Sequence, residues 1–323
     1  MARARPRSTA ISIALSVALS IGSALATVLG VASVVFFAFR LLPGDPSELV
    51  LGEHATLQER QALRHQLHLD EPLARQYAHF LGRLARGEFG PSLKRPTWDA
   101  GRVVLDALPD TALLSTIAVV LGALLGVGVA LTSVGARGGL ARACADRFLG
   151  LATAVPLLAY APAVTWLLAV RFRLVPLPAD PDAGARGLLF AATLLSVPLS
   201  AAVGRVARSS LREAKASPFL QVARAKGRSE LAVWVIHALP VCVGPIITVV
   251  AAQLGALLGG AIVLERILER RGLGTVIAEA LAARDLPVIE ASVVFSALLF
   301  VIAQAGGERL HALVDPRARE RSP

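Results

Sequence analysis

The chain has 323 residues, of which 55% are hydrophobic and only 17% are charged, and its mean hydropathy is +0.63. Soluble domains carry about a quarter charged residues, so this composition excludes a wholly soluble protein and indicates that lipid solvates most of the chain. The formal net charge is +10. In a membrane protein a basic balance is typical of cytoplasmic loops, and we expect no nucleic-acid partner.

The N-terminal residues MARARPR lead into a charge-free window from Ser8 to Phe39. This window is far longer than the apolar core of a signal peptide, which has about 7–15 residues. It also does not end in a clean small-residue cleavage site before Arg40. We therefore expect a retained membrane anchor.

Six windows are long enough to form membrane spans, since a helix needs about 20 apolar residues to cross the hydrocarbon core. The last window is short but is extended by Leu286–Ile289, and Pro240 and Pro245 are expected to divide a leading amphipathic piece from the fifth span. The prediction is an all-α polytopic membrane protein with six transmembrane helices. The windows are Ser8–Phe39, Thr111–Ala136, Phe148–Val170, Gly187–Gly204, Leu231–Leu264 and Ala291–Gly307.

Lys and Arg in the short loops set the direction of the spans. If the N-terminus lies inside, the inner segments hold 17 basic residues and the short outer loops hold 7. We therefore expect both termini to be cytoplasmic. The expected order is a tail and first helix at 1–42, a larger external segment at 43–107, a core of five helices at 108–307 that includes a cytoplasmic loop at 205–240, and a cytoplasmic tail at 308–323.

The predicted spans contain almost no ionisable side chains; His237 lies at the entry of one and Glu290 near the start of another. A proton- or sodium-driven carrier and an intramembrane protease both lack the residues they would need. No G-x-x-x-x-G-K-[ST] phosphate-binding motif occurs, so any ATP chemistry belongs to another chain. We expect no metal site, and we interpret His65 and His68 as solvated helix residues.

Small residues point to close packing of the spans. Two G-x-x-x-G spacings, at 122–126 and 255–259, predict helix pairs whose backbones approach closely. Cys144 and Cys242 have no metal-ligand spacing, and we expect both to be small buried side chains.

The stretch FLQVARAKGRSELAVWVIHALP, at residues 219–240, is basic at its start and apolar at its end. Ala223 and Gly227 leave little side-chain bulk, and Gly227 can turn the chain with a positive φ. Ser229 is placed to cap a second helical piece, which Pro240 should end or kink. The stretch predicts a short helix–turn–helix at the cytoplasmic surface. From its residues alone, both docking on a partner and binding to anionic lipid headgroups stay open.

The spacing from Gly227 to His237-Ala238-Leu239-Pro240 resembles the EAA loop of bacterial ABC importer permeases. The stretch RSSLREAKASPFLQVARAKGRSE is similar to that loop in the dipeptide/oligopeptide/nickel branch. FRLLPGDP follows the first span as in that branch, and HLDEPLARQYAHFLGRLARGEFGPS is similar to its external segment. LPDTALL, ERRGLGTVIAEALAARDLPV and ALVDPRAR resemble its later landmarks. The resemblance extends from about Phe39 to Arg319, in order and at the spacing of the family.

The resemblance implies a transmembrane permease subunit of an ATP-driven importer in the bacterial cytoplasmic (inner) membrane, without enzyme activity of its own. It implies two ABC ATPase subunits that hold ATP and Mg, a second homologous permease chain and an extracytoplasmic substrate-binding protein. The hairpin is then the coupling element that docks on an ATPase. The residues expected to make or shape this contact are Gln221, Val222, Ala223, Arg224, Lys226, Gly227, Ser229, His237 and Pro240.

Some features depart from the family pattern or leave alternatives open. The loop reads Gln-Val-Ala where the general motif has an acidic residue, and Pro-Leu-Leu-Ala-Tyr in the third window matches only loosely. Peptides, nickel chelates and other small solutes stay open as cargo, and a non-transporting sensory or binding protein is the alternative function. Pro43, Gly44, Asp45 and Pro46 are a candidate external gate, or a turn that stops the first helix.

Overall fold

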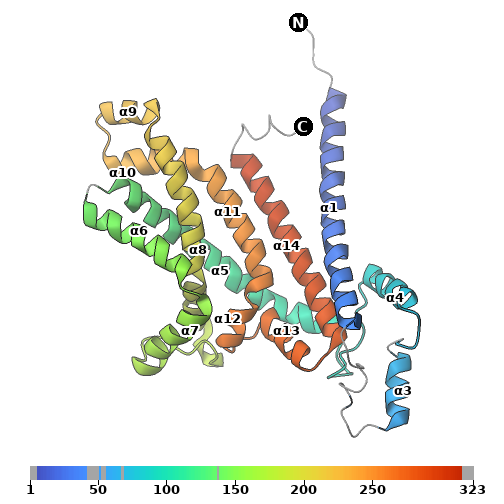
Figure 1. Cartoon of the computed structure of the whole chain (residues 1–323). Coiled ribbons are helices and arrows are strands. Elements are labelled where there is room, and N and C mark those ends of the chain that lie inside the picture. The colour runs from blue at the N-terminus through green and yellow to red at the C-terminus, as the bar shows by residue number, and fades with distance from the viewer. Residues whose placement is uncertain (1–5, 42–50, 52–55, 67–68, 137, 315–323) are drawn as a thin grey trace. The chain divides into compact units, whose positions relative to one another are not determined.

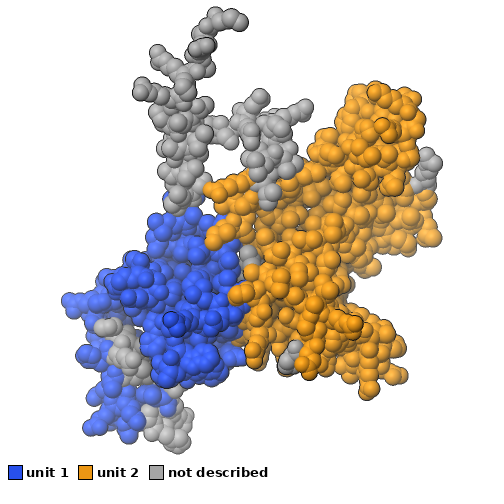
Figure 2. Space-filling view, turned by 180° about the vertical axis from the view of Figure 1, so that it is seen from behind, with its two compact units in different colours: residues 1–108, 276–301 blue, residues 109–275, 302–323 orange. Residues whose placement is uncertain are grey.

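The computed structural model describes residues 6–41, 51, 56–66, 69–136 and 138–314 (Figure 1). The regular structure of these residues is helical, with one isolated antiparallel bridge that pairs Pro91 with Asp99. This confirms the all-α prediction. The chain divides into two compact units (Figure 2): residues 1–108 with 276–301, and residues 109–275 with 302–323.

The first unit is organised around α1 (Pro6–Leu41) and α4 (Leu73–Arg86). Phe36 is fully buried, and its ring centroid lies 5.2 Å from that of Tyr77 and 5.0 Å from that of Phe80. The Tyr77 hydroxyl is also 2.7 Å from the Ser33 hydroxyl. Aromatic packing therefore attaches the amphipathic helix α4 to the end of α1. A short helix, α3 (Leu57–Gln66), precedes α4.

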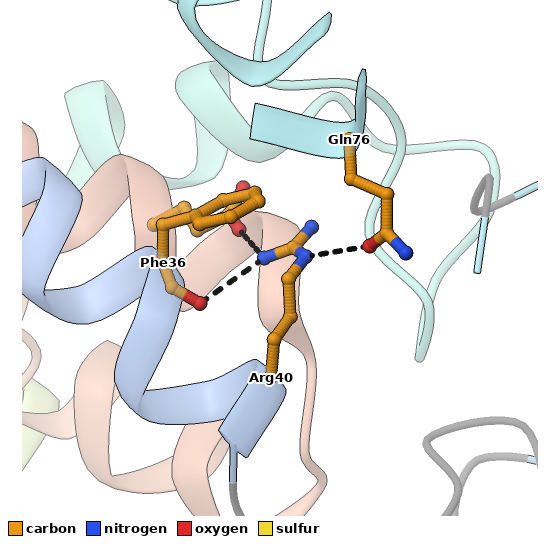
Figure 3. Close-up of polar contacts among 4 residues, drawn as sticks. Phe36, Arg40 and Gln76 are labelled. Atoms are coloured by element: carbon orange, nitrogen blue, oxygen red, sulfur yellow. Dashed lines mark hydrogen bonds and ion pairs between the residues drawn. The ribbon is translucent and has the colours of Figure 1, made fainter. Parts of the chain in front are cut away.

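A buried ion pair lies beside this aromatic cluster. The Arg40 guanidinium donates to the Glu290 carboxylate at 2.9 Å and to the Gln76 side-chain oxygen at 3.1 Å (Figure 3). It also lies 3.7 Å above the Phe36 ring. Glu290 belongs to α14 (Leu286–Val314), so one cation links three helices of this unit. A buried charge is tolerated only when it is paired in this way.

The same unit fixes the connection that follows α4. Gly87 takes φ +70°, and the amides of Gly87 and Glu88 close the helix end on the carbonyls of Leu84 and Arg83. Further along, the buried Asp285 carboxylate accepts bonds from the Ser92 hydroxyl and from the amides of residues 93 and 94. The segment 87–94 is therefore held at both of its ends.

The second unit is built around α8 (Gly184–Lys215), which packs against α6 (Gly139–Ala154) and α11 (Leu239–Gly260). The helix α5 (Ala100–Gly135) approaches α8 closely where two of its glycines face it. A Cβ on Gly122 would lie 2.7 Å from Leu199 Cβ, and one on Gly126 would lie 2.5 Å from the Ser200 carbonyl oxygen. The close approach predicted at 122–126 is confirmed.

The helices confirm a membrane protein of five or six spans. Five are long and apolar enough to cross a bilayer among the described residues, and a bent pair of helices can supply a sixth. Each of the five overlaps one predicted window. They are Gly22–Arg40, Ala100–Gly135, Gly184–Lys215, Glu230–Leu257 and Leu286–Gly307.

The third window, Phe148–Val170, is not one continuous helix, and the bent pair is the sixth candidate span. The chain bends by 105° between α6 and the following pair α7 (Leu157–Thr165) and η1 (Trp166–Arg171). Pro156 causes the break, because the residue before a proline is pushed out of the helical region. Val155 accordingly has φ −89° and ψ 117°.

The expected division of the fifth window at Pro240 and Pro245 is wrong. Helical conformation is continuous from α10 (Glu230–Ala232) through the π-helical turn η3 (Val233–Ala238) into α11. The π turn precedes Pro240, and such wide turns accommodate residues that disturb the regular hydrogen-bond ladder. Pro245 lies inside α11.

The two cysteines differ in burial. Cys242 is buried as predicted, whereas Cys144 is exposed on α6, so the expectation of two buried cysteines is wrong for Cys144. A helix of 16 residues with one inward face leaves positions on its other face uncovered within a single chain.

The side chain of His68 lies outside the described residues, as do residues 42–50 with Pro43, Gly44, Asp45 and Pro46.

Candidate functional site

The candidate site is the hairpin formed by α9 (Pro218–Ala225), the turn at 226–229 and the continuous helix that begins at Glu230. In Figure 1 it lies at the end of α8 and α11 that is remote from α7 and α12 (Ile262–Ile267). The helix α8 continues past its apolar window to Lys215. Pro218 then takes the first position of α9, where its missing N–H costs no helical bond. The predicted helix–turn–helix is present.

Local sequence determines the turn. Gly227 has φ +76°, its amide bonds the Arg224 carbonyl at 2.9 Å, and the Arg228 amide bonds the Ala223 carbonyl at 3.4 Å. This pair of bonds is the Schellman arrangement, which favours glycine at the left-handed position. The Ser229 hydroxyl then accepts from the Ala232 amide at 3.3 Å and caps the second helix, as predicted.

The inner face of the hairpin belongs to the core of the second unit. Leu220, Val233 and Ala238 are fully buried, and Ala223 and Trp234 are nearly so. They form one apolar cluster with residues of α5, α8 and α11. The Trp234 ring fits against Gly135, where a Cβ would lie 2.9 Å from the ring. The hairpin is therefore continuous with the packed helices, and a force on it reaches them without passing through a flexible linker.

The outer face combines apolar and basic side chains. Phe219 and Val222 lie about one turn apart on α9 and are 41% and 53% exposed, and Leu231 on the second limb is 75% exposed. Lys226 and Arg228 are exposed in the turn between the limbs. Clustered apolar groups beside cations are typical of a surface that docks on another protein.

One ion pair joins the two limbs. The Arg224 Nε donates to a Glu230 carboxylate oxygen at 3.0 Å, and the guanidinium lies 5.7 Å from the Trp234 ring centroid. Both partners of the pair are about one-third exposed, so we expect it to orient the limbs more than it stabilises them.

The structure places most of the predicted contact residues on the outside. Ala223 is buried inside the chain, so it shapes the hairpin from within and offers no surface to a partner. Arg224 and His237 are half-buried, and the His237 Nδ1 lies 3.3 Å from the Ala232 carbonyl oxygen. The exposed predicted residues are Gln221, Val222, Lys226, Gly227, Ser229 and Pro240.

Sequence reasoning missed three residues of this surface and one of its interior. Phe219 and Leu231 are exposed apolar residues, and Glu230 pairs with Arg224 across the turn. Helical spacing from Val222 points to Phe219, and the basic turn gives Glu230 an obvious partner. Trp234 packs on a glycine of a helix a hundred residues earlier, and no local pattern in the sequence indicates that contact.

The sequence matches two families of known proteins over most of its length. Residues 114–320 match the family described as "Binding-protein-dependent transport system inner membrane component", and residues 16–94 match the N-terminal family of the same systems. The glutathione transport system permease protein GsiC of Salmonella typhimurium is 31% identical over 300 residues, covering 91% of this chain and 95% of that protein. A probable peptide ABC transporter permease, y4tP of Sinorhizobium fredii, is 28% identical over 92% of this chain and 96% of its own length.

Among solved structures, an inward-facing form of the MetNI methionine ABC transporter superposes with a TM-score of 0.50 at 15% identity. The match covers 66% of this chain and 96% of that one, and it supports the fold. The family and the long apolar helices make the chain a multi-pass protein of the bacterial inner membrane. The resemblance seen in the sequence is confirmed. The chain belongs to the binding-protein-dependent transport system inner membrane components, the permease subunits of ABC importers.

Proposed function

We propose that this permease moves peptides or similar small solutes into the cell, and that the hairpin from Pro218 to Ala238 receives the driving motion from an ATPase subunit. The coupling role is supported by the difference between the two faces of the hairpin. Its inner face is buried in the helix core, and its outer face presents Phe219, Val222 and a basic turn to solvent.

Continuity between the hairpin and a membrane span supports a mechanical role. The second limb enters α11 without a break in helical conformation, and the first limb follows α8 across a short turn at residues 216–217. A rigid-body displacement of the hairpin therefore displaces two spans together, since packed elements move as units. A loop tethered only by its ends would not transmit such a displacement.

The proposed assembly contains this chain, a second homologous permease subunit, two ATPase subunits and a substrate-binding protein outside the membrane. Permeases of this family work with ATPase and substrate-binding partners, and ATP and Mg belong to the ATPases. The proposed orientation places both termini and the hairpin in the cytoplasm, in line with the excess of Lys and Arg on that side.

The proposed cargo class rests on the relatives and on the chemistry of the spans. The two relatives are described as permeases for glutathione and for peptides. The predicted apolar windows of this chain hold few polar groups beyond Gln253, Gln304 and scattered hydroxyls, which suits a passage that does not hold cargo tightly. Selectivity then resides in the binding protein. The relatives give no support to a non-transporting sensory protein.

Charge substitutions on the outer face test the coupling role. Val222→Asp places a carboxylate in the proposed apolar contact, where desolvation is costly. We expect it to reduce co-purification of the ATPase subunits at least tenfold and to abolish ATP-dependent uptake of a labelled peptide in vesicles. Leu140→Asp is the matched control, because Leu140 is a 78% exposed leucine at the start of α6, outside the hairpin.

The two readouts separate the two parts of the proposal. If the Val222→Asp complex still co-purified with the ATPase subunits and still took up the labelled peptide, the coupling assignment would be wrong. If the wild-type complex hydrolysed ATP but accumulated no peptide with any binding protein of its own system, the cargo class would be wrong while the coupling role stood.

A further inference from the structure

A large apolar groove lies within the second unit, between the α7–η1 segment and α8. Its volume is about 640 Å³, and its lining is mainly aliphatic and includes Phe190. All of its lining residues fall between Tyr160 and Val197. The groove runs along the N-terminal part of the α8 span, on a face that lipid or a neighbouring helix covers in a membrane.

The polar groups inside the groove already have partners. The Tyr160 hydroxyl donates to the Leu194 carbonyl at 2.6 Å, and the Thr193 hydroxyl donates to the Leu189 carbonyl at 2.7 Å. Neither hydrogen is left to donate to an occupant. The carbonyl groups of a peptide would find no free hydroxyl donor in the interior of the groove, and burying them there would cost free energy that a hydrocarbon chain does not lose. The interior therefore selects an apolar occupant.

The rim of the groove carries one cation. Arg186 lies two residues inside α8 and is exposed, and it forms no ion pair with another residue of the described chain. From Arg186 to Val197 the helix advances about 16 Å at 1.5 Å per residue. Half of the hydrocarbon thickness of a bilayer is about 15 Å. The groove thus runs from a cation near the N-terminal end of the α8 span over about the thickness of one leaflet.

We propose that this groove binds one anionic phospholipid, with an acyl chain along α8 and the phosphate on the Arg186 guanidinium. A free cation at the surface, an apolar wall of leaflet depth and internally satisfied hydroxyls all match the chemistry of that molecule. All residues of this proposed lipid site belong to this chain, and none of them belongs to the coupling hairpin.

Photo-labelling of the assembled importer tests the proposal. The complex is reconstituted in nanodiscs with phosphatidylglycerol that carries a photoactivatable group on its acyl chain, and labelled peptides within residues 157–197 are quantified by mass spectrometry. We expect Arg186→Gln to lower labelling about fivefold, which at 1.4 kcal/mol per tenfold corresponds to about 1 kcal/mol. Leu189→Trp, which fills the groove from an exposed position, should abolish labelling there.

Arg173→Gln is the matched control, because Arg173 is an exposed cation on the connection before α8 and does not line the groove. Unchanged labelling in Arg186→Gln, or an equal loss in Arg173→Gln, would overturn the phosphate contact. Absence of labelling in the wild-type complex would mean that a protein partner covers the groove. Competition by a peptide cargo would mean that the groove belongs to the passage. Each variant is compared at equal recovery of monodisperse complex, so a folding defect is not read as a loss of lipid.

Discussion

Proline inside a membrane span frees a backbone carbonyl that no water can reach. In α8, Pro198 has no N–H to donate to the carbonyl of Leu194, four residues earlier. The Tyr160 hydroxyl from α7 donates to this carbonyl at 2.6 Å. The Tyr160 side chain thus replaces the missing hydrogen bond of α8 and connects α7 to that helix.

Tyr160→Phe leaves that carbonyl unsatisfied, and we expect it to lower the free energy of unfolding by about 1–3 kcal/mol. The measurement is thermal unfolding of the purified chain in detergent, followed by circular dichroism. Pro198→Ala restores the missing N–H, so in that background the cost of Tyr160→Phe should nearly vanish. An equal cost in both backgrounds would show that Tyr160 stabilises the fold by packing alone.

A second residue-scale network surrounds Glu265, which is almost fully buried on α12. One carboxylate oxygen accepts from the Thr111 hydroxyl at 2.6 Å and the other from the Gly274 amide at 2.6 Å. Thr111 in turn accepts from the Leu273 amide at 2.7 Å. Gly272 is required here, because a Cβ would collide with the carboxylate. The network holds the start of α13 (Leu273–Ala282).

This network predicts a pH dependence. Burial raises the pKa of the Glu265 carboxyl above its usual 4.5, and the hydrogen bonds from Thr111 and Gly274 and the charge of Arg270 oppose the rise without cancelling it. The folded chain therefore keeps a proton at pH values where the unfolded chain has lost it. The free energy of unfolding should fall as the pH rises from about 4.5 through the raised pKa.

Glu265→Gln has no proton to lose, so its stability should lack this fall, and at neutral pH it should lie about 1–3 kcal/mol lower because an amide N–H faces a donor. Thermal unfolding between about pH 4.5 and pH 8 measures both effects. Glu269→Gln, at an exposed neighbouring position, should keep the wild-type profile. A Glu265→Gln profile parallel to that of the wild type would contradict the assignment.

At the scale of elements, the contact of α5 with α8 depends on the absence of side chains. A Cβ on Gly126 would lie 2.5 Å from the Ser200 carbonyl oxygen and 2.9 Å from the Gly204 amide nitrogen. Both neighbours are backbone atoms and cannot rotate away. Two residues further along α5, a Cβ on Gly128 would have no heavy atom within 4 Å.

These two glycines form a matched pair for mutation. Gly126→Ala must separate α5 from α8, and we expect a loss of about 1–3 kcal/mol in the free energy of unfolding. Gly128→Ala should be neutral or stabilising by up to about 1 kcal/mol, because alanine is the better helix former. Unfolding of both variants in detergent gives the comparison. Equal effects at the two positions would show that the close approach of the helices does not limit stability.

The sequence predicts elements well where one segment decides its own conformation. Apolar windows located the spans, and Gly227 and Ser229 predicted the turn and cap of the hairpin, because positive φ and capping are local properties. The rest depends on partners distant in sequence. Pro156 breaks a window whereas Pro240 is accommodated by a π turn, and the difference lies in how each proline's neighbours pack. The inward face of Ala223 and the contact of Trp234 with Gly135 likewise require the assembled core.

At the scale of the whole molecule, the proposed function requires the hairpin and the connection at 172–183 to lie on opposite sides of the membrane. The helix α8 joins them as a span of 32 residues. The basic-residue rule predicts that the hairpin is cytoplasmic, and the expected topological segments 1–42, 43–107, 108–307 and 308–323 follow from the same rule. Cysteine labelling tests this orientation, and Cys144→Ser is the starting variant because Cys144 is exposed whereas Cys242 is buried.

In that background, Ser229→Cys places a thiol in the exposed turn, and Arg173→Cys places one in the connection before α8. A membrane-impermeant maleimide on intact spheroplasts should label Arg173→Cys and leave Ser229→Cys unlabelled until the membrane is permeabilised. The expectation rests on charge, since carrying the cluster from Arg205 to Arg228 across the bilayer would cost several kcal/mol for each cation. Labelling of Ser229→Cys in intact spheroplasts would place the hairpin outside the cytoplasm, where no ATPase can reach it. Both the predicted orientation and the coupling proposal would then be wrong.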